Sequence, residues 1–293
     1  MTGHDRHHIS RGVCYGLATT VVGATAAVTV KWLNGQGLSP WFIVWVQYGI
    51  GVLVLVPWLL RLGPATALRT SRLRIHTIRS LGGWVGFCAF YLALPSVPLV
   101  DATVLRYAAP LWVPVVVWLW WRSRIPMPRA LALLGGFVGV LVMLRPDMAG
   151  INAGHLLGVL AGLGLAVSMA ATRALSSSEP ANRVLCYYFG IAFLASTPMA
   201  LPHLQPLTLA TTMGLLYVGL SIFLTMVLYT RAFSYAPTTV VAPLSYVGVP
   251  VAGLLDWWLW GHLPQAAAVY GILIIIFCGV LAVTSGHRQP SEH

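Results

Sequence analysis

The chain has 293 residues, of which 58% are hydrophobic and only 8% are charged. A water-soluble domain carries about 25% charged residues, so this composition excludes an ordinary soluble protein and indicates that a lipid bilayer surrounds most of the chain. The formal net charge of +11 lies in the connections between apolar runs, where it indicates membrane topology and predicts no nucleic-acid partner.

About ten apolar runs follow one another along the chain, and a run of about 20 residues can cross a hydrocarbon core of roughly 30 Å. The predicted helices cover residues 11–31, 40–60, 78–95, 100–121, 129–145, 154–174, 181–201, 208–230, 238–260 and 266–285. The first run follows a short charged head, but many runs come after it, so we interpret it as an uncleaved helix. The sequence therefore predicts an all-α integral membrane protein whose function lies between its helices.

Residue patterns that mark catalytic sites are missing from the sequence. There is no HExxH, no pair of intramembrane aspartates, no Ser/His dyad and no GxxxxGK[ST] phosphate loop. The cysteines lie inside apolar runs without metal-ligand spacing; they are Cys14, Cys88, Cys186 and Cys278. We therefore expect no enzyme, no metal and no other cofactor, and any energy source must be a gradient of ions or solutes.

Arginine and lysine predict the orientation, because positively charged loops stay in the cytoplasm. With the N-terminus inside, only Lys31 and Arg145 fall outside. The inside residues are Arg6, Arg11, Arg61, Arg69, Arg72, Arg74, Arg79, Arg122, Arg124, Arg129, Arg173, Arg183, Arg231 and Arg288. This asymmetry predicts a multi-pass protein of the inner (cytoplasmic) membrane with both termini cytoplasmic, and we expect it to act as a monomer.

The sequence repeats itself at an offset near 139 residues. The matched stretches are Tyr91–Pro98 with Tyr229–Pro237, Tyr107 with Tyr246, and Trp118–Trp121 with Trp257–Trp260. Each half holds five apolar runs, an odd number, so the two copies must enter the membrane from opposite sides. Many secondary transporters are built from such inverted repeats around a site near the midplane. We therefore predict two inverted five-helix repeats, over residues 1–150 and 151–293.

With these stretches in view, the chain resembles the EamA branch of the drug/metabolite transporter superfamily over nearly its whole length. The most specific stretches are Ala93–Trp121 and Ala232–Gly261. The resemblance implies a ten-helix inverted-repeat carrier that moves small organic solutes, often by exporting amino acids or related metabolites. The family often shows a Gly-Glu pair at the end of the fourth and ninth helices, whereas this chain has Trp121-Arg122 and Gly261-His262.

Three ionisable residues fall inside predicted membrane helices, where such groups are costly and are therefore functional candidates. They are Asp101, Arg106 and Asp256. Arg106 and Asp256 are expected at similar depth below the outer edge, roughly 9 Å for Arg106 at about 1.5 Å per residue. We predict that they form an outer gate, which opens when a substrate carboxylate competes for the guanidinium. Alternatively, Arg106 extends to the outer headgroups or forms a structural ion pair.

Two mechanisms of energy coupling fit the sequence. Asp256 is the only deep carboxylate that could carry a proton during transport, so proton coupling through it is one possibility. Facilitated diffusion needs no such group and fits the small number of carboxylates equally well. Asp101 belongs to the first turn of its helix, where a carboxylate complements the helix dipole.

Neutral polar and aromatic residues complete the predicted substrate site, since ligand sites are mostly apolar with a few polar groups. Besides Arg106, the candidates are Gln47, Trp84, Tyr91, Tyr107 and Tyr246. An arginine beside aromatic rings predicts an amino acid or a related carboxylate as the substrate. The alternatives are a carrier for drugs, vitamins or nucleotide derivatives, and a membrane sensor or assembly factor that transports nothing.

Overall fold

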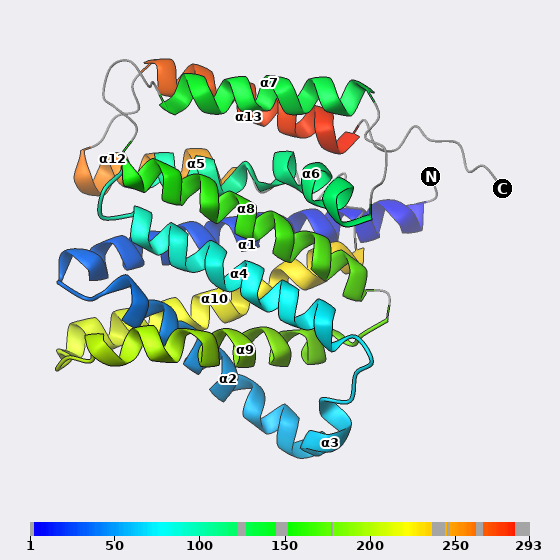
Figure 1. Cartoon of the computed structure of the whole chain (residues 1–293), viewed down its shortest axis with the longest axis vertical. Coiled ribbons are helices and arrows are strands. Elements are labelled where there is room, and N and C mark those ends of the chain that lie inside the picture. Colours follow the sequence, from blue (N-terminus) through cyan, green and yellow to red (C-terminus); the bar gives the residue numbers. More distant parts are fainter. Residues whose placement is uncertain are drawn as a thin grey trace.

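The computed structural model describes residues 3–121, 127–144, 152–176, 178–235, 244, 247–261 and 266–284, and all regular secondary structure in them is helical (Figure 1). The helices, in chain order, are α1 (Gly3–Gly35), α2 (Pro40–Leu62), α3 (Pro64–Ala67), α4 (Leu73–Ala93), α5 (Leu99–Tyr107), α6 (Ala109–Trp121), α7 (Met127–Leu144), α8 (Ala153–Ser176), α9 (Ala181–Ala200), η1 (Leu201–His203), α10 (Leu209–Tyr235), α12 (Gly248–Trp260) and α13 (Ala266–Thr284). They form one bundle.

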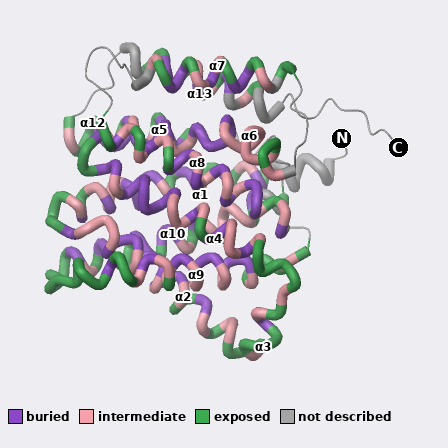
Figure 2. The backbone as a smooth tube through the Cα atoms, in the orientation of Figure 1, coloured by how far each residue is buried: buried purple, intermediate pink, exposed green. Residues whose placement is uncertain are grey.

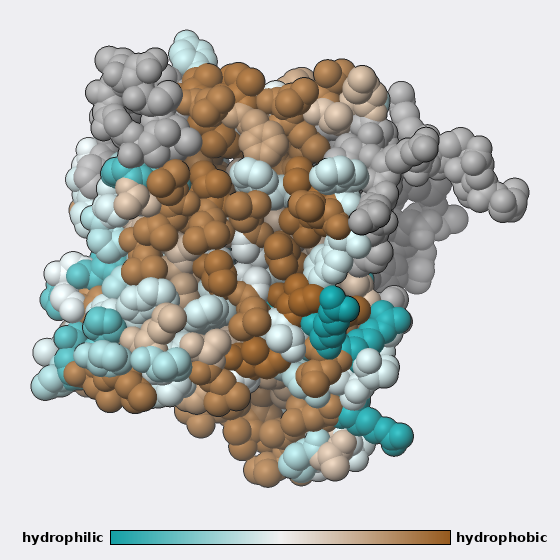
Figure 3. Space-filling view, in the orientation of Figure 1, coloured by the Kyte–Doolittle hydropathy of each residue, from teal (hydrophilic) through white to brown (hydrophobic). Residues whose placement is uncertain are grey.

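The length and hydropathy of these helices fit a membrane protein. Among the described residues, six helical stretches are long and apolar enough to span a bilayer, and two shorter apolar helices lie in α7 and α13. Figure 3 shows a broad hydrophobic surface over the middle of one face, with hydrophilic residues toward two of its edges. Every predicted apolar run that the structure describes in full is helical over most of its length. The prediction of an all-α integral membrane protein is therefore confirmed.

The predicted fourth run is a helix in two parts. α5 ends at Tyr107 and α6 begins at Ala109, and Ala108 between them has φ −68° and ψ −3°. Pro110 has no amide hydrogen to donate to the carbonyl four residues earlier, so the ladder of helical hydrogen bonds is interrupted here. The break lies within the membrane-spanning stretch and directly follows Arg106 and Tyr107.

The packing of the helices has the two-fold pattern that inverted repeats require. If α1, α2 and α4 correspond to α8, α9 and α10, then the α4·α8 contact corresponds to α10·α1, and α4·α9 to α10·α2, and all four contacts are present. The contacts α2·α9 and α7·α13 each pair a helix with its own counterpart. The start of α1 and the end of α13 lie on the same side of the bundle (Figure 1). We call this the termini side, and the opposite one the far side.

The boundary predicted between residues 150 and 151 lies outside the described residues.

The buried residues run through the middle of the bundle, where helices of both halves meet (Figure 2). Tyr48 of α2 and Tyr188 of α9 lie in this core with their hydroxyl oxygens 3.3 Å apart. Their positions differ by 140 residues, which is close to the repeat offset.

The contact between α4 and α8 depends on glycine. A Cβ atom at Gly164 of α8 would lie 2.6 Å from the backbone nitrogen of Gly86 and 2.7 Å from the carbonyl oxygen of Gly82. Neither backbone atom can move away alone, so the two helices approach this closely only because residue 164 has no side chain.

We predict that Gly164→Ala lowers the melting temperature in detergent, because overpacking of a core costs about 1–3 kcal/mol. The matched control is Gly190→Ala in α9, where the added Cβ meets nothing within 4 Å. That change should leave the melting temperature unchanged or raise it, since alanine has a higher helix propensity than glycine. Equal effects of the two substitutions would contradict the assigned role of Gly164.

Candidate substrate-binding cavity

A cavity of about 130 Å³ lies among helices of both halves. Its walls come from α1, α4, α5, the start of α6, α8, α9 and α10. Most of the wall is apolar or aromatic, which suits the body of a small organic molecule. Among the described residues that line it, the charged ones are Arg79 and Arg106, and no carboxylate is present.

Arg106 is held at the cavity by aromatic rings. It lies in the last turn of α5, directly before the helix break. Its guanidinium carbon is 4.0 Å from the ring centre of Phe87 and 4.7 Å from that of Phe90, both on α4. A guanidinium on an aromatic face is attracted by the ring quadrupole and keeps its N–H donors available at its edge.

Arg79 is the second cation of the cavity; from the sequence it was counted among the positive charges of the cytoplasmic side, at the start of the helix predicted over residues 78–95. It lies in the second turn of α4 and is only 3% exposed. Its Nε donates a hydrogen bond to the Thr172 hydroxyl at 2.9 Å, and its guanidinium carbon lies 4.3 Å from the ring centre of Tyr188. Its Nη1 is buried and has no hydrogen-bond partner among the described residues.

Two hydroxyl groups on the wall resemble Arg79 Nη1, because they too are buried polar atoms without a described partner. The Oγ1 atoms of Thr103 on α5 and Thr225 on α10 line the cavity and are buried without a hydrogen-bond partner among the described residues. Buried polar atoms are nearly always paired with protein, water or ligand. The cavity therefore presents polar groups from three helices that a bound molecule can satisfy.

The predicted site residues separate into four groups. Arg106, Tyr91 and Tyr107 line the cavity. Gln47 lies behind the wall, where its Oε1 accepts a hydrogen bond from the Tyr91 hydroxyl and its Nε2 has no partner among the described residues. Trp84 packs against the apolar core and is not among the described lining residues. Tyr246 lies outside the described residues.

The ion pair predicted between Arg106 and Asp256 is not the one that the structure contains. Asp256 is fully buried and accepts a hydrogen bond from Lys31 Nζ at 2.8 Å and another from the Leu99 amide at 2.9 Å. Lys31 Nζ also lies 4.6 Å from the ring centre of Trp260. The prediction was wrong because α1 continues past Lys31 to Gly35 and packs on α12, so Lys31, expected at the outer end of the first helix, reaches Asp256.

This contact joins α1, α5 and α12 on the far side. Because α1 and α5 belong to the first half and α12 to the second, the ion pair ties the halves together. We call the set of Lys31, Leu99, Asp256 and Trp260 the far-side contact. The first turn of α5 also carries Asp101, as predicted.

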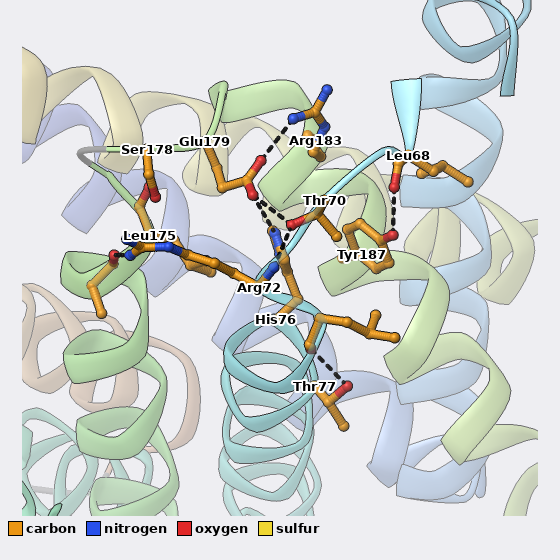
Figure 4. A network of polar contacts seen from close by, with 12 residues as sticks. Leu68, Thr70, Arg72, His76, Thr77, Leu175, Ser178, Glu179, Arg183 and Tyr187 are labelled. Carbon is orange, nitrogen blue, oxygen red and sulfur yellow. Dashed lines mark hydrogen bonds and ion pairs between the residues drawn. The ribbon is translucent and has the colours of Figure 1, made fainter. Parts of the chain in front are cut away.

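A second polar network joins the halves on the termini side (Figure 4). Glu179, between α8 and α9, accepts hydrogen bonds from the Thr70 hydroxyl and from Arg183 Nη1, and His76 Nε2 lies 3.9 Å from its carboxylate. Arg183 Nε in turn donates to the carbonyl of Ala67 at 2.8 Å. We call these residues the termini-side network.

The electrostatics of Glu179 follow from these partners. Burial raises the pKa of the carboxyl, but hydrogen bonds from Thr70 and Arg183 and the positive charge of Arg183 outweigh it, so that the pKa lies below its usual value of 4.5. The carboxylate is therefore charged at neutral pH and holds the connection after α2 against the start of α9.

A helical membrane protein with a cavity between two inverted halves has the architecture of a membrane carrier. The model of the EamA-like transporter family matches residues 10–145 and 152–285. The two matches cover nearly the whole chain, so the protein belongs to the EamA-like transporter family and is a multi-pass transporter, not an enzyme.

Curated relatives match along most of their own length. The chain is 26% identical over 291 residues to a riboflavin transporter of Vibrio cholerae, covering 98% of this chain and 97% of the relative. It is 25% identical to an S-adenosylmethionine uptake transporter of Rickettsia prowazekii, with 96% and 95% covered. It is 28% identical to a pseudopaline exporter of Pseudomonas aeruginosa, with 83% and 86% covered.

The fold also occurs among solved crystal structures. One of them superposes with a TM-score of 0.66 at 17% sequence identity and covers 96% of this chain and 99% of its own. At this identity the likeness concerns the fold alone.

We predict that Glu179→Gln lowers the melting temperature at neutral pH by a few degrees, because the ion pair with Arg183 is lost. The folded pKa of Glu179 is depressed, so its contribution to stability is complete above the unfolded pKa and disappears as the pH falls through the folded pKa. The two melting curves should therefore converge in acid.

The matched control is Arg69→Gln, which changes an exposed residue of the same connection. It should leave the melting temperature unchanged at every pH. A difference between wild type and Glu179→Gln that persists undiminished below the folded pKa would contradict the assigned ion pair.

Proposed function

We propose that this protein is a secondary transporter that exports small organic metabolites bearing a carboxylate, most directly amino acids or their derivatives. The observation that carries the proposal is the Arg106 guanidinium, which faces a cavity between the two halves with no carboxylate among its described lining residues. In a site of low dielectric constant, a cation without a counter-ion favours an anionic ligand. The planar fork of arginine matches a carboxylate with two parallel hydrogen bonds.

The rest of the wall suits the remainder of such a molecule. Phe87, Phe90 and Tyr91 on α4 present aromatic surface beside the arginine, and Tyr107 lies next to it on α5. An amino acid derivative with an apolar side chain would place its carboxylate at Arg106 and its apolar group against these rings. Gln47, behind the wall, would fix the position of the Tyr91 hydroxyl.

Alternating access would use the two inter-half contacts as gates. The far-side contact of Lys31 and Asp256 would close the cavity on one side, and the termini-side network around Glu179 would hold the halves on the other. Opening to one side requires that the contacts there break while those on the opposite side remain. Asp256 acts here as a gate residue with Lys31, and proton coupling through it is a separate possibility that a pH gradient tests.

The relatives support a small organic solute without specifying which one. Their names give riboflavin, S-adenosylmethionine and pseudopaline, and they include both an uptake transporter and an exporter. At 25–28% identity, neither the substrate nor the direction transfers to this chain. The arginine distribution supports the inner membrane and a cytoplasmic termini side.

We predict that wild-type protein in proteoliposomes carries labelled amino acids or derivatives in a saturable manner, and that Arg106→Ala reduces this flux roughly tenfold or more, as expected for a lost charge-assisted interaction. Arg106→Lys should retain part of the flux, because the charge remains. The control is Arg74→Ala, an exposed residue of α4, which should transport normally.

Different results would assign different functions. No saturable flux of any amino acid or derivative would contradict the proposed substrate class and favour another solute or a non-transporting sensor or assembly factor. Normal flux by Arg106→Ala would remove the proposed site while leaving the family assignment intact. If the flux depends on a pH gradient in wild type but not in Asp256→Asn, transport is coupled to protons through Asp256.

We also predict that Asp256→Asn opens the far side. Thr103→Cys places one thiol on the cavity wall, in a background where the four native cysteines are replaced by serine. A membrane-impermeant maleimide applied to the far side in oriented vesicles should label this thiol several times faster when Asp256 is asparagine, since Lys31 then has no carboxylate to hold. Glu179→Gln serves as the control, because it loosens the opposite side. Equal labelling in all three proteins would contradict the gate.

A further inference from the structure

Arg79 is a buried cation that the proposed function has not used. It lies on the cavity wall and is 3% exposed, so its charged end does not reach water or headgroups. No carboxylate of the described residues forms a salt bridge with it. Its described partners are neutral: the Thr172 hydroxyl and the ring of Tyr188.

Such an arrangement is unfavourable for a residue with a purely structural role. Burying a charge without a counter-ion costs several kcal/mol, and a buried arginine normally pairs with a carboxylate. The hydrogen bond to Thr172 and the contact with Tyr188 fix the position of the guanidinium but do not neutralise it. Nη1 is left without a partner among the described residues, at the cavity. An anionic group of a ligand would supply both the missing charge and the missing acceptor.

Arg79 and Arg106 lie at different levels of the cavity. Arg106 of α5 stacks on Phe87 of α4. Arg79 lies eight residues before Phe87 on α4, which places its backbone about 12 Å from that of Phe87 along the helix axis, at about 1.5 Å per residue. Spacings of four residues relate Arg79, Gly83 and Phe87, so all three lie along one face of α4, and all three line the cavity. The guanidinium groups lie on different rings, Arg79 on Tyr188 and Arg106 on Phe87, so they form two separate anchor points on the cavity wall.

We propose that Arg79 is a second anion-binding residue, and that the cavity takes a substrate with two anionic groups, one bound at Arg106 and the other at Arg79. The segment between the two groups would lie against the aromatic wall, with the unpartnered hydroxyls of Thr103 and Thr225 as additional donors. This inference rests on the proposed function, because it uses the same cavity and the same anchor, and it narrows the substrate class from carboxylates to dianions.

The test measures binding of α,ω-dicarboxylates, from succinate to sebacate, and of their monomethyl esters to the purified full-length protein. Each pair differs only in one charge, so the comparison isolates the second anionic group. We expect the best dicarboxylate to bind roughly tenfold or more tightly than its ester, the amount of one charge-assisted interaction. We also expect the affinity to pass through a maximum as the chain length matches the distance between the arginines.

The two arginines should respond differently. Arg79→Gln should weaken the best dicarboxylate to the level of its ester, leave the ester unchanged and abolish the dependence on chain length. Arg106→Gln should weaken both members of the pair. Arg79→Lys keeps the charge and should retain part of the preference, and Arg74→Gln, an exposed arginine of the same helix, should bind like wild type.

Thermal unfolding without ligand separates this role from a structural one. Removing an uncompensated buried charge should leave the melting temperature of Arg79→Gln equal to that of wild type or higher, whereas a structural arginine would lower it. If dicarboxylate and ester bind equally to wild type and Arg106→Gln weakens both, Arg79 is not an anion site and the proposed function stands. If no compound of the series binds, the dianion proposal fails and the amino acid flux assay still decides the proposed function; if binding is indifferent to Arg106, both proposals fail.

Discussion

In the hydrocarbon core of a bilayer no water pairs with polar groups, so a charge at that depth needs a partner in the protein or a place on an internal cavity that water or a ligand can enter. The protein meets this requirement in two ways. Asp256 is fully buried but is bound by Lys31 and the Leu99 amide, so it connects the two halves. Arg79 and Arg106 have aromatic neighbours and, among the described residues, no carboxylate within salt-bridge distance. The paired charge is suited to closing the bundle, and the two arginines are suited to a ligand.

Most of the fold could be predicted because lipid imposes strong rules on sequence. Apolar runs of membrane length give the helices, and an odd number of runs in each repeat gives the inverted arrangement that the packing of α4 on α8 and α10 on α1 reflects. Helix ends were less predictable. The first helix was predicted to end at Lys31, but α1 extends to Gly35, and the first positive φ that follows is at Gly37. That small extension brings Lys31 to Asp256.

The site was predictable in part, since Arg106 and Tyr107 lie near the middle of an apolar run. Arg79 was missed for the opposite reason. It follows Arg69, Arg72 and Arg74 in a basic segment, and nothing in its local sequence separates it from charges that mark topology. Only its position on one helix face with Gly83 and Phe87 distinguishes it, and that face acquires meaning once α8 and α9 are known to pack against it. The partner of Asp256 likewise depends on which helices pack against α12. The spacing of residues within one helix carries no information about that packing.

The repeat also explains how such a bundle can change shape without losing its core. Tyr48 of α2 and Tyr188 of α9 are 140 residues apart, close to the repeat offset, and their hydroxyl oxygens lie 3.3 Å apart, so we infer that the pseudo-two-fold axis lies close to this contact. An exchange of conformation between the two halves maps this contact onto itself, because each tyrosine takes the place of the other. The far-side contact and the termini-side network lie away from the axis and have different residues, so no such exchange preserves them. In the proposed alternating-access cycle, contacts at the axis would therefore stay closed, while the contacts at each end would break in turn.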